Sequence, residues 1–298
     1  MAAAIITAVG GRTSLAHPLH RSSRLLQASL AIVAAVFRPE YLTPVMASEG
    51  ALPTVASISR DPLATSRELG SPLPSFPPEQ VAVAFNGGKD SVVVIDLIER
   101  VIGLANVRRC FVFCYDGPEE DDFEELRAFR AHYCATRGIS LHRLAGGAVG
   151  KRHATWAMYH EGGIRCAILG TRRSDGVSQT QPVELGGNSG WPPLWRCAPV
   201  FEWETADIWG YTRSRALPNC LLYEQGYSSL GSRSSTKRDP ALVRKGGAAV
   251  AARKGVPAWR GEGGSTAPEA ASVDRSDELL TFIPAWDSPR PGDRVARL

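Results

Sequence analysis

The sequence lacks several features that would restrict its function class at once. Its six cysteines include no CxxC pair, which excludes zinc sites of the ribbon type. No apolar run reaches the roughly 18–20 residues of a membrane-spanning helix, and the best candidate, Leu25 to Phe37, is interrupted by Gln27 and Ser29. We therefore expect no membrane partner and six reduced, buried thiols. The cysteines are Cys110, Cys114, Cys134, Cys166, Cys197 and Cys220.

Acidic residues are missing from the start of the chain, where Glu40 is the first and four arginines precede it. An acid-free segment with arginine and serine is typical of an organellar transit peptide, so residues 1–45 are interpreted as a transit peptide or a disordered extension. Met46 offers an alternative start. The expected location is cytoplasmic, or mitochondrial or plastid if the transit peptide is genuine. Residues 46–78, rich in Ser and Pro, are interpreted as a linker.

Charge of one sign is not in strong excess. The net charge is +4 over 298 residues, with 44% hydrophobic and 21% charged residues. Much of the positive excess lies in the N-terminal arm, so nucleic acid is not an expected partner and a small anionic substrate explains the charge equally well. The length suits one large domain or two small ones. The oligomeric state stays open, and a monomer is compatible with the composition.

Short apolar runs alternate with segments of helical periodicity, which predicts a Rossmann-like α/β fold with a parallel sheet and helices on both faces. The expected strands are 81–85, 110–115, 139–144 and 165–169, and the expected helices are 91–102, 123–137, 153–160 and 203–216. Residues 174–190 are expected to be a long loop. The predicted domain spans 79–243, followed by a flexible insertion at 244–278 and a C-terminal segment at 279–298 that docks back on the core.

The most informative segment is Ala84-Phe-Asn-Gly-Gly-Lys-Asp-Ser91, between a strand and a helix. It is neither a GxxxxGK[ST] loop nor a GxGxxG fingerprint. Paired glycines let the backbone approach a phosphate, and the amides and dipole of the following helix favour an anion. Lys89 adds positive charge, Asn86 and Ser91 are candidate hydrogen-bond donors, and Asp90 is a candidate helix cap. The alternative is an ordinary strand-to-helix turn.

This loop resembles the pyrophosphate loop of the PP-loop ATP pyrophosphatases, in the superfamily that includes the phosphoadenosine phosphosulfate reductases. The Phe-Asn variant is similar to that of the eukaryotic FAD synthases, although Ala84 and Ser91 replace a usual Ser and Cys. Further matches follow in the same order as in that family. They are Gly170-Thr-Arg-Arg-Ser-Asp175, Gly190-Trp-Pro-Pro-Leu-Trp-Arg196, Ala198-Pro-Val-Phe-Glu-Trp203, Asp207-Ile-Trp209, Leu222-Tyr-Glu-Gln-Gly-Tyr-Ser-Ser-Leu-Gly-Ser-Arg233 and, more weakly, Phe282-Ile-Pro-Ala-Trp286.

The resemblance implies an adenine nucleotide alpha-hydrolase-like fold and an enzyme that transfers AMP from ATP to FMN, giving FAD and pyrophosphate. It implies Mg²⁺ bound with ATP and assigns no metal-ligating side chain. The residues it assigns to ATP are Ala84, Phe85, Asn86, Gly87, Gly88, Lys89, Asp90, Ser91, Gly170 and Arg172. Asn86, Lys89 and Arg172 are the expected catalytic residues. The residues it assigns to FMN are Asp175, Asn188, Trp191, Arg196, Arg294 and Arg297.

Three departures from the family pattern keep alternatives open. Gly176 replaces a usual Pro, and Asn188 replaces a usual Asp that is expected to contact the flavin ring. The insertion at 244–278 has no counterpart in the pattern. Another PP-loop enzyme, such as a reductase of adenylylated sulfate or a tRNA thiolation enzyme, is one alternative, although the cysteine motifs typical of those enzymes are missing. The other alternative is an inactive homologue that binds flavin or nucleotide.

Overall fold

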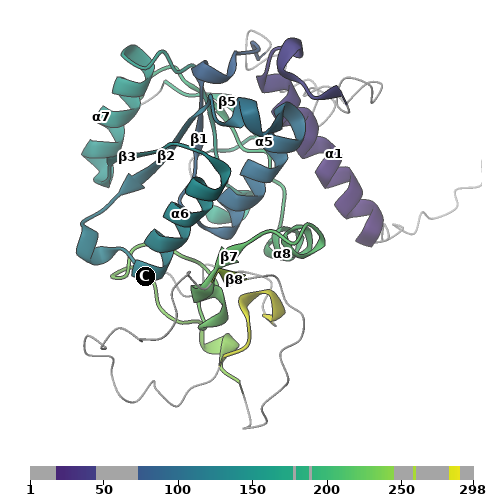
Figure 1. Cartoon of the computed structure of the whole chain (residues 1–298), viewed down its shortest axis with the longest axis vertical. Helices are drawn as coiled ribbons and strands as arrows, with labels where there is room; N and C mark the ends of the chain where they lie inside the picture. Colours follow the sequence, from purple (N-terminus) through teal and green to yellow (C-terminus); the bar gives the residue numbers. More distant parts are fainter. Residues whose placement is uncertain are drawn as a thin grey trace, which may run out of the picture.

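The computed structural model describes residues 18–44, 73–176, 179–187, 190–244, 258–259 and 282–288. Within them, a six-stranded sheet has the order β3-β2-β1-β4-β6-β5. Figure 1 shows β3, β2 and β1 side by side, with α5 and α6 in front of them. The strands are β1 (Val81–Ala84), β2 (Phe111–Asp116), β3 (Leu141–Ala145), β4 (Cys166–Ile168), β5 (Val183–Leu185) and β6 (Trp195–Cys197). All pair in parallel except β5, which is antiparallel to β6. The predicted α/β fold is therefore confirmed.

Helices cover both faces of this sheet. They are α1 (Pro18–Val36), α5 (Lys89–Val107), α6 (Glu124–Arg137), α7 (Gly147–His160) and α8 (Thr205–Ser214). Alternate residues of a strand face opposite sides, and in β1 Val81 and Val83 join the apolar cluster that contains residues of α1, α5, α6 and α8. Ala82 joins a second cluster that includes Met158 of α7. Strands buried on both faces explain the continuous apolar runs in the sequence.

The N-terminal helix α1 lies within residues 1–45, interpreted from the sequence as a transit peptide or a disordered extension, and it is packed on the core. The interpretation as a transit peptide stays a prediction. α1 packs against α5, and Val33, Val36 and Phe37 are buried in the main apolar cluster. The hydroxyl of Ser29 donates to the carbonyl of Pro199 at 2.7 Å and accepts from the indole of Trp203 at 3.0 Å. Ser29, a polar residue that interrupts the apolar run 25–37, thus makes buried hydrogen bonds to the rest of the core. In the described part of the chain, none of the helices has the length and hydropathy to span a membrane.

The described end of the predicted linker also belongs to the core. Phe76 is buried and forms a parallel bridge with Phe37, and its amide donates to the carbonyl of Val36 at 2.7 Å. The packed part of the chain therefore includes residues before the boundary expected at residue 79, because Phe76 already pairs with Phe37 at the end of α1. Residues 45–72 lie outside the described part of the chain.

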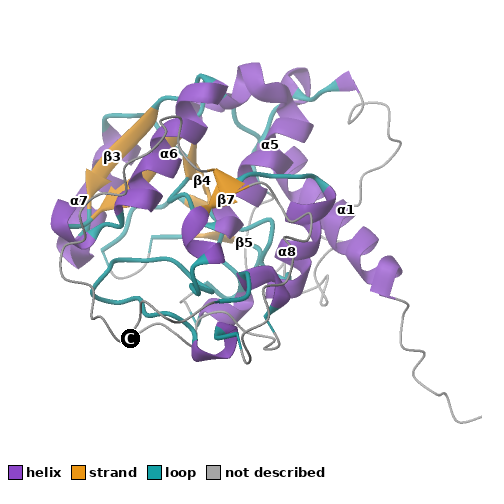
Figure 2. Ribbon diagram, turned by 60° about the horizontal axis from the view of Figure 1, so that its bottom comes forward, coloured by secondary structure: helices purple, strands orange, loops and turns teal. Residues whose placement is uncertain are grey.

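The segment 174–190, expected to be a long loop, contains the edge strand β5. β5 pairs with β6, another strand that apolar pattern did not predict, and Glu184 of β5 forms an ion pair with Arg196 of β6. Both strands have only three residues, too few for a periodicity of two to be visible. Figure 2 shows how the loops, drawn in teal, gather on one side of the sheet between α7 and α8.

The six cysteines are all free and buried, as the absence of motif pairs predicts. Burial raises the pKa of Cys110 and Cys220 to about 12 and that of Cys134 to about 11, from an ordinary value near 9. Below the ordinary value, folded and unfolded chains both hold these protons. Above it, the unfolded chain ionises first, so the thiols favour unfolding progressively until the pH reaches their raised values.

We therefore expect the free energy of unfolding to fall as the pH rises from about 9 to about 11, and the thiols to add no pH dependence below about pH 8. Urea denaturation under reducing conditions across this range measures the effect. Buried tyrosines such as Tyr211, whose pKa is raised to about 12 chiefly by burial, act in the same direction. A midpoint that stays constant up to pH 11 would contradict the prediction.

Candidate active site

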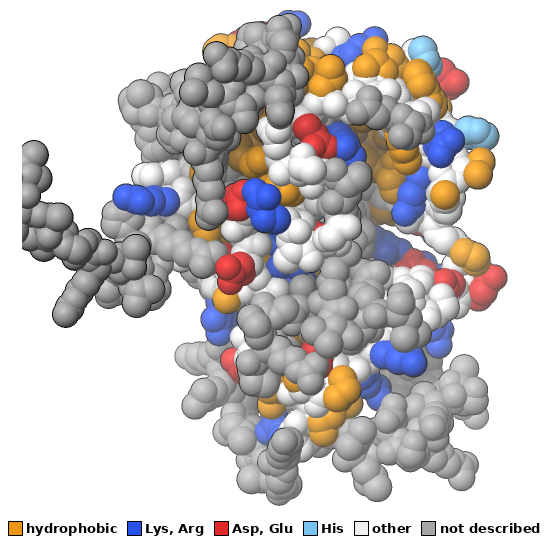
Figure 3. All heavy atoms as spheres, turned by 180° about the vertical axis from the view of Figure 1, so that it is seen from behind, with side chains coloured by type: hydrophobic (Ala, Val, Ile, Leu, Met, Phe, Trp, Pro, Cys, Tyr) orange, Lys and Arg blue, Asp and Glu red, His pale blue; other side chains and the backbone are white. Residues whose placement is uncertain are grey.

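A cavity of about 610 Å³ lies beyond the carboxyl ends of the central strands. Each of four parallel strands contributes the residues that directly follow it: Phe85 after β1, Gly117 after β2, Gly146 after β3 and Leu169 after β4. This is where ligands bind in open parallel sheets. Seen from behind, the molecule is hollowed on the side where α7 lies, and basic and acidic side chains are visible inside the hollow (Figure 3).

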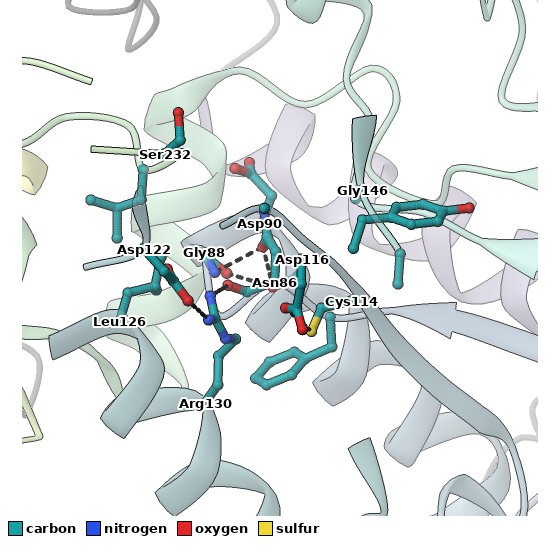
Figure 4. A pocket seen from close by; sticks show the side chains of 18 of the residues that line it. Asn86, Gly88, Asp90, Cys114, Asp116, Asp122, Leu126, Arg130, Gly146 and Ser232 are labelled. Atoms are coloured by element: carbon teal, nitrogen blue, oxygen red, sulfur yellow. Dashed lines mark hydrogen bonds and ion pairs between the residues drawn. The ribbon is translucent and has the colours of Figure 1, made fainter. Parts of the chain in front are cut away.

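The glycine loop is held in shape by its own side chains (Figure 4). Oδ1 of Asn86 accepts from the amide of Gly88 at 2.9 Å and from the hydroxyl of Ser91 at 3.0 Å. The Ser91 hydroxyl also lies 2.8 Å from the carbonyl oxygen of Gly88. Asn86 and Ser91, expected to donate to a ligand, thus hold the turn together in this structure. Such preorganisation lowers the cost of ordering the loop around a ligand.

Gly87 shows why the loop needs a glycine at this position. Its φ of +79° lies in the left-handed region, and a Cβ placed there would come within 2.6 Å of Cγ of Arg130. Gly87 does not line the cavity; it lies against α6, whereas Gly88 lines it. The guanidinium of Arg130 donates to the carbonyl of Asn86 at 3.3 Å and pairs with Asp122. Helix α6 therefore supports the loop from below.

Lys89, Asp90 and Arg172 form a charged group at the start of α5. The carboxylate of Asp90 lies 3.2 Å from Nζ of Lys89 and 2.9 Å from Nε of Arg172. The structure shows no side-chain cap on α5, so the expectation that Asp90 caps this helix is wrong. Both basic residues are nearly fully buried, with exposures of 2% for Lys89 and 1% for Arg172. Buried charges need such partners, and Asp90 supplies one to each.

Arg172 has two further contacts, one with the start of α8 and one with the short helix Arg173–Asp175 that follows it. Its Nη1 donates to the hydroxyl of Thr205 at 3.0 Å, and its backbone amide donates to the carboxylate of Asp175 at 2.8 Å. Arg172, Asp175 and Gly170 all line the cavity. The motif at 170–175 and the glycine loop at 84–91 thus meet at one end of the sheet, because they follow the neighbouring strands β4 and β1.

Not every predicted residue reaches the cavity. Trp191 is 37% exposed and does not line it, and Arg196 pairs with Glu184 between β5 and β6. Their assignment to FMN stays a prediction. Three other residues assigned to FMN lie outside the described part of the chain: Asn188, Arg294 and Arg297.

The structure also brings in residues that motif comparison did not assign. Arg130 and Lys151 come from α6 and α7, Asp116 ends β2, and Tyr223 lies within a motif that was matched without giving it a role. The amide of Lys89 donates to the hydroxyl of Tyr223 at 3.0 Å. Asp116 ends β2 and Gly146 follows β3. Because ligands bind at the carboxyl ends of parallel strands, these positions could have been predicted from the expected strands. Arg130 and Lys151 lie within helices, where no pattern in the sequence indicates which side chains face the cavity.

Among the described residues, nine charged side chains line the cavity, four basic and five acidic. They are Lys89, Arg130, Lys151, Arg172, Asp90, Asp116, Asp121, Asp122 and Asp175. Side-chain charge alone therefore does not make this an anion site. Backbone amides and the positive end of the α5 dipole must supply attraction for phosphates, as helix N-termini generally do.

Comparison with known proteins supports the sequence motifs. A family model described as the phosphoadenosine phosphosulfate reductase domain matches residues 134–238. A probable FAD synthase of Caenorhabditis elegans is 31% identical over 169 residues, which is 56% of this chain and 32% of the relative. A probable FAD synthase of Schizosaccharomyces pombe is 29% identical over 186 residues, covering 58% of this chain and 66% of the relative. The chain thus spans about a third of the length of the worm relative.

The fold is that of solved FMN adenylyltransferases. The crystal structure of the enzyme from Candida glabrata superimposes with a TM-score of 0.63 at 17% identity, covering 96% of this chain and 91% of that one. The resemblance to the eukaryotic FAD synthases is confirmed. The reductase-domain match begins within α6, after the glycine loop. The FAD synthase resemblance therefore accounts for a part of the cavity that the match to the reductase domain leaves out.

Proposed function

We propose that this chain is an FMN adenylyltransferase that transfers AMP from ATP to the phosphate of FMN, giving FAD and pyrophosphate. The observation that carries the proposal is the glycine loop at the start of α5, with Lys89 buried beside it, at a cavity formed by four strand ends. Its volume of about 610 Å³ is typical of a small-molecule site. Similarity to the named FAD synthases supports the choice of substrates.

ATP would lie with its phosphates against the loop and the first turn of α5. Amides there and the helix dipole favour the negative charge. Lys89, held by Asp90, adds a positive charge whose position the ion pair fixes. Arg172, held by Asp90 and Thr205, lies at the other side of the same carboxylate. Both cations are in place before substrate arrives, so little reorganisation accompanies the reaction.

A phosphate oxygen of FMN would attack the α-phosphorus of ATP in line. A new P–O bond forms as the bond from the α-phosphorus to the β-bridging oxygen breaks, and pyrophosphate leaves with that electron pair. The attacking phosphate is an anion near neutral pH, so no general base is required. The protein contributes positioning and charge stabilisation, which are the main sources of rate in phosphoryl-type transfer.

Mg²⁺ fits this site as an ion carried by ATP. Among the described residues, no group of three or more His, Cys, Asp or Glu side chains is arranged to hold a metal. Mg²⁺ usually keeps several waters and binds through substrate phosphates with one or two carboxylates. Asp90, at the end of the glycine loop, and Asp116, the last residue of β2, both line the cavity and are candidates for this contact. The ion would neutralise the triphosphate charge, which the described side chains of the cavity, with four basic and five acidic groups, do not neutralise.

The flavin would be held by residues beyond the loop. Among the described residues of the predicted FMN set, Asp175 lines the cavity, whereas Trp191 and Arg196 do not. The predicted contacts of Asn188, Trp191, Arg196, Arg294 and Arg297 belong to this proposal as well. The Candida glabrata FMN adenylyltransferase, which has a similar fold, was solved in complex with FMN and an ATP analogue, and this supports the binding of both substrates.

The direct test is to incubate the purified chain with ATP, Mg²⁺ and FMN. We expect FAD and pyrophosphate to appear in a one-to-one ratio, measured by chromatography and a coupled pyrophosphate assay. Chelation of Mg²⁺ with EDTA is expected to stop both products, because the lining alone does not neutralise the triphosphate. Pyrophosphate without FAD would contradict the proposed acceptor.

A reductase of adenylylated sulfate is the alternative that the family match favours. Incubation with adenylylated sulfate and a thiol reductant separates the two functions. Release of sulfite without formation of FAD from FMN and ATP would replace our proposal by this alternative. All six thiols are buried, which leaves none exposed for the covalent chemistry that a thiol-dependent reductase would use.

A further inference from the structure

Tyr223 lies beneath the glycine loop and is 1% exposed. Its hydroxyl accepts from the backbone amide of Lys89 at 3.0 Å, and its ring lies 5.9 Å from Nζ of Lys89. Tyr223 and Lys89 are 134 positions apart in sequence. The amide belongs to the first residue of α5, one of the groups at a helix start that have no partner within the helix. The hydroxyl therefore holds the start of this helix in place.

The hydroxyl is suited to this role because it stays neutral. Burial raises the pKa of Tyr223 above its ordinary value of 10. A buried neutral acceptor gives the amide a partner without bringing a negative charge next to a phosphate site. Removal of the oxygen leaves the amide unpaired in a buried environment, which is costly.

Two tryptophans continue from Tyr223 away from the cavity. The ring of Trp209, on α8, meets the ring of Tyr223 at 5.0 Å with an interplanar angle of 85°. The ring of Trp286 meets that of Trp209 at 5.5 Å and 64°. Edge-to-face contacts of this kind are favourable beyond the area that they bury. Trp286 belongs to the segment 282–288, near the end of the chain. The aromatic column formed by Tyr223, Trp209 and Trp286 therefore links that segment to the glycine loop.

The C-terminal segment is also anchored next to Tyr223. The ring of Phe282 lies so close to Gly226 that a Cβ on this glycine would come within 2.4 Å of it. The amide of Ile283 donates to the carbonyl of Leu242 at 2.8 Å, and Phe282 forms an antiparallel bridge with Val243. The segment thus contacts the chain just after the turn that carries Tyr223, at Gly226, and is held a second time at Leu242 and Val243.

We propose that Tyr223 is a positioning residue for the ATP site, and that segment 282–288 sets its place through Trp286 and Trp209. ATP affinity then depends on the docking of a segment that does not itself line the cavity. This inference rests on the proposed function. The two can fail separately, because wild-type chain that does not bind ATP contradicts the function, whereas unchanged affinity in the variants contradicts only the positioning role.

The first experiment compares Tyr223→Phe with Tyr211→Phe by calorimetric titration with the α,β-methylene analogue of ATP and, separately, with FMN. Tyr211 is a matched control, since its buried hydroxyl donates to Asp96 at 2.6 Å away from the cavity. We expect Tyr223→Phe to weaken analogue binding about tenfold, with FMN affinity changed less than about twofold. Tyr211→Phe is expected to lower the melting temperature with analogue affinity unchanged. Equal analogue affinity in wild type and Tyr223→Phe overturns the positioning role.

The second experiment tests the column with Trp286→Ala, Trp286→Phe and the double variant Tyr223→Phe/Trp286→Ala. Trp286→Ala is expected to weaken analogue binding about fivefold, and Trp286→Phe, which keeps a ring, to restore most of it. In a double-mutant cycle the two effects should not multiply, because both act through the Lys89 amide. Independent effects, or a Trp286→Ala variant that is folded and binds the analogue as wild type does, overturn the proposed link.

Discussion

Lys89→Met is expected to lower the rate of FAD formation by about a hundredfold or more, because it removes a fixed positive charge at the site where phosphate charge develops. Met fills much of the space of the buried Lys89 stem. Asp90 retains Arg172 at 2.9 Å, so the folded state keeps an ion pair. The effect should therefore fall on turnover, with a small change in melting temperature. Initial rates at saturating FMN and varied ATP measure it.

Lys237→Met is the matched control. Lys237 is exposed and does not line the cavity, so loss of its charge should leave the rate within about twofold of wild type. If Lys89→Met formed FAD as fast as this control, the glycine loop and its lysine could not be the phosphate site. The proposed orientation of ATP would then have to be abandoned.

The largest stability effect is expected for Asp90→Asn, which we predict to lower the free energy of unfolding by about 2–3 kcal/mol. The substitution keeps the shape of the side chain but removes the charge that faces both Lys89 and Arg172. Those cations are 2% and 1% exposed, so water compensates them poorly. Asp175 lies 3.7 Å from Nη2 of Arg172 and offsets part of the loss. Urea denaturation followed by circular dichroism gives the difference.

Glu119→Gln removes an equivalent negative charge from a surface ion pair. Glu119 contacts Arg127 at 2.7 Å, but its side chain is 74% exposed. Exposed pairs contribute little, so a change below about 0.5 kcal/mol is expected. Should both variants lose the same stability, burial would not be the reason that the Asp90 pairs matter, and the charged group at the start of α5 would need another explanation.

The alternation of strands and helices could be predicted because each element carries its own periodicity. The strand expected at 110–115 is found at Phe111–Asp116, and the helix expected at 123–137 is found at Glu124–Arg137. The glycine loop was predictable for the same reason, since its turn chemistry is contained in consecutive residues. These features depend on local conformational preference and on burial of one face.

Other features depend on what lies opposite in the fold. The packing of α1 could not be predicted, because arginine and serine content says nothing about a docking face on α5. β5 and β6 have three residues each, and their pairing with neighbouring strands is what makes them strands. Asp90 was expected to cap its helix, but in the folded chain its carboxylate forms an ion pair with Arg172, which follows β4.

By itself, the sequence determined the order of the elements from β1 to β4, the family resemblance and the position of a phosphate-type loop between a strand and a helix, because neighbouring residues contain that information. Only the tertiary structure decided which side chains surround the loop: Arg130 beneath it, Arg172 beside it and Tyr223 on the amide of Lys89. Contacts between residues separated by dozens of positions leave no periodic trace in the chain. They arise when parallel strands bring their carboxyl ends to one edge of a sheet.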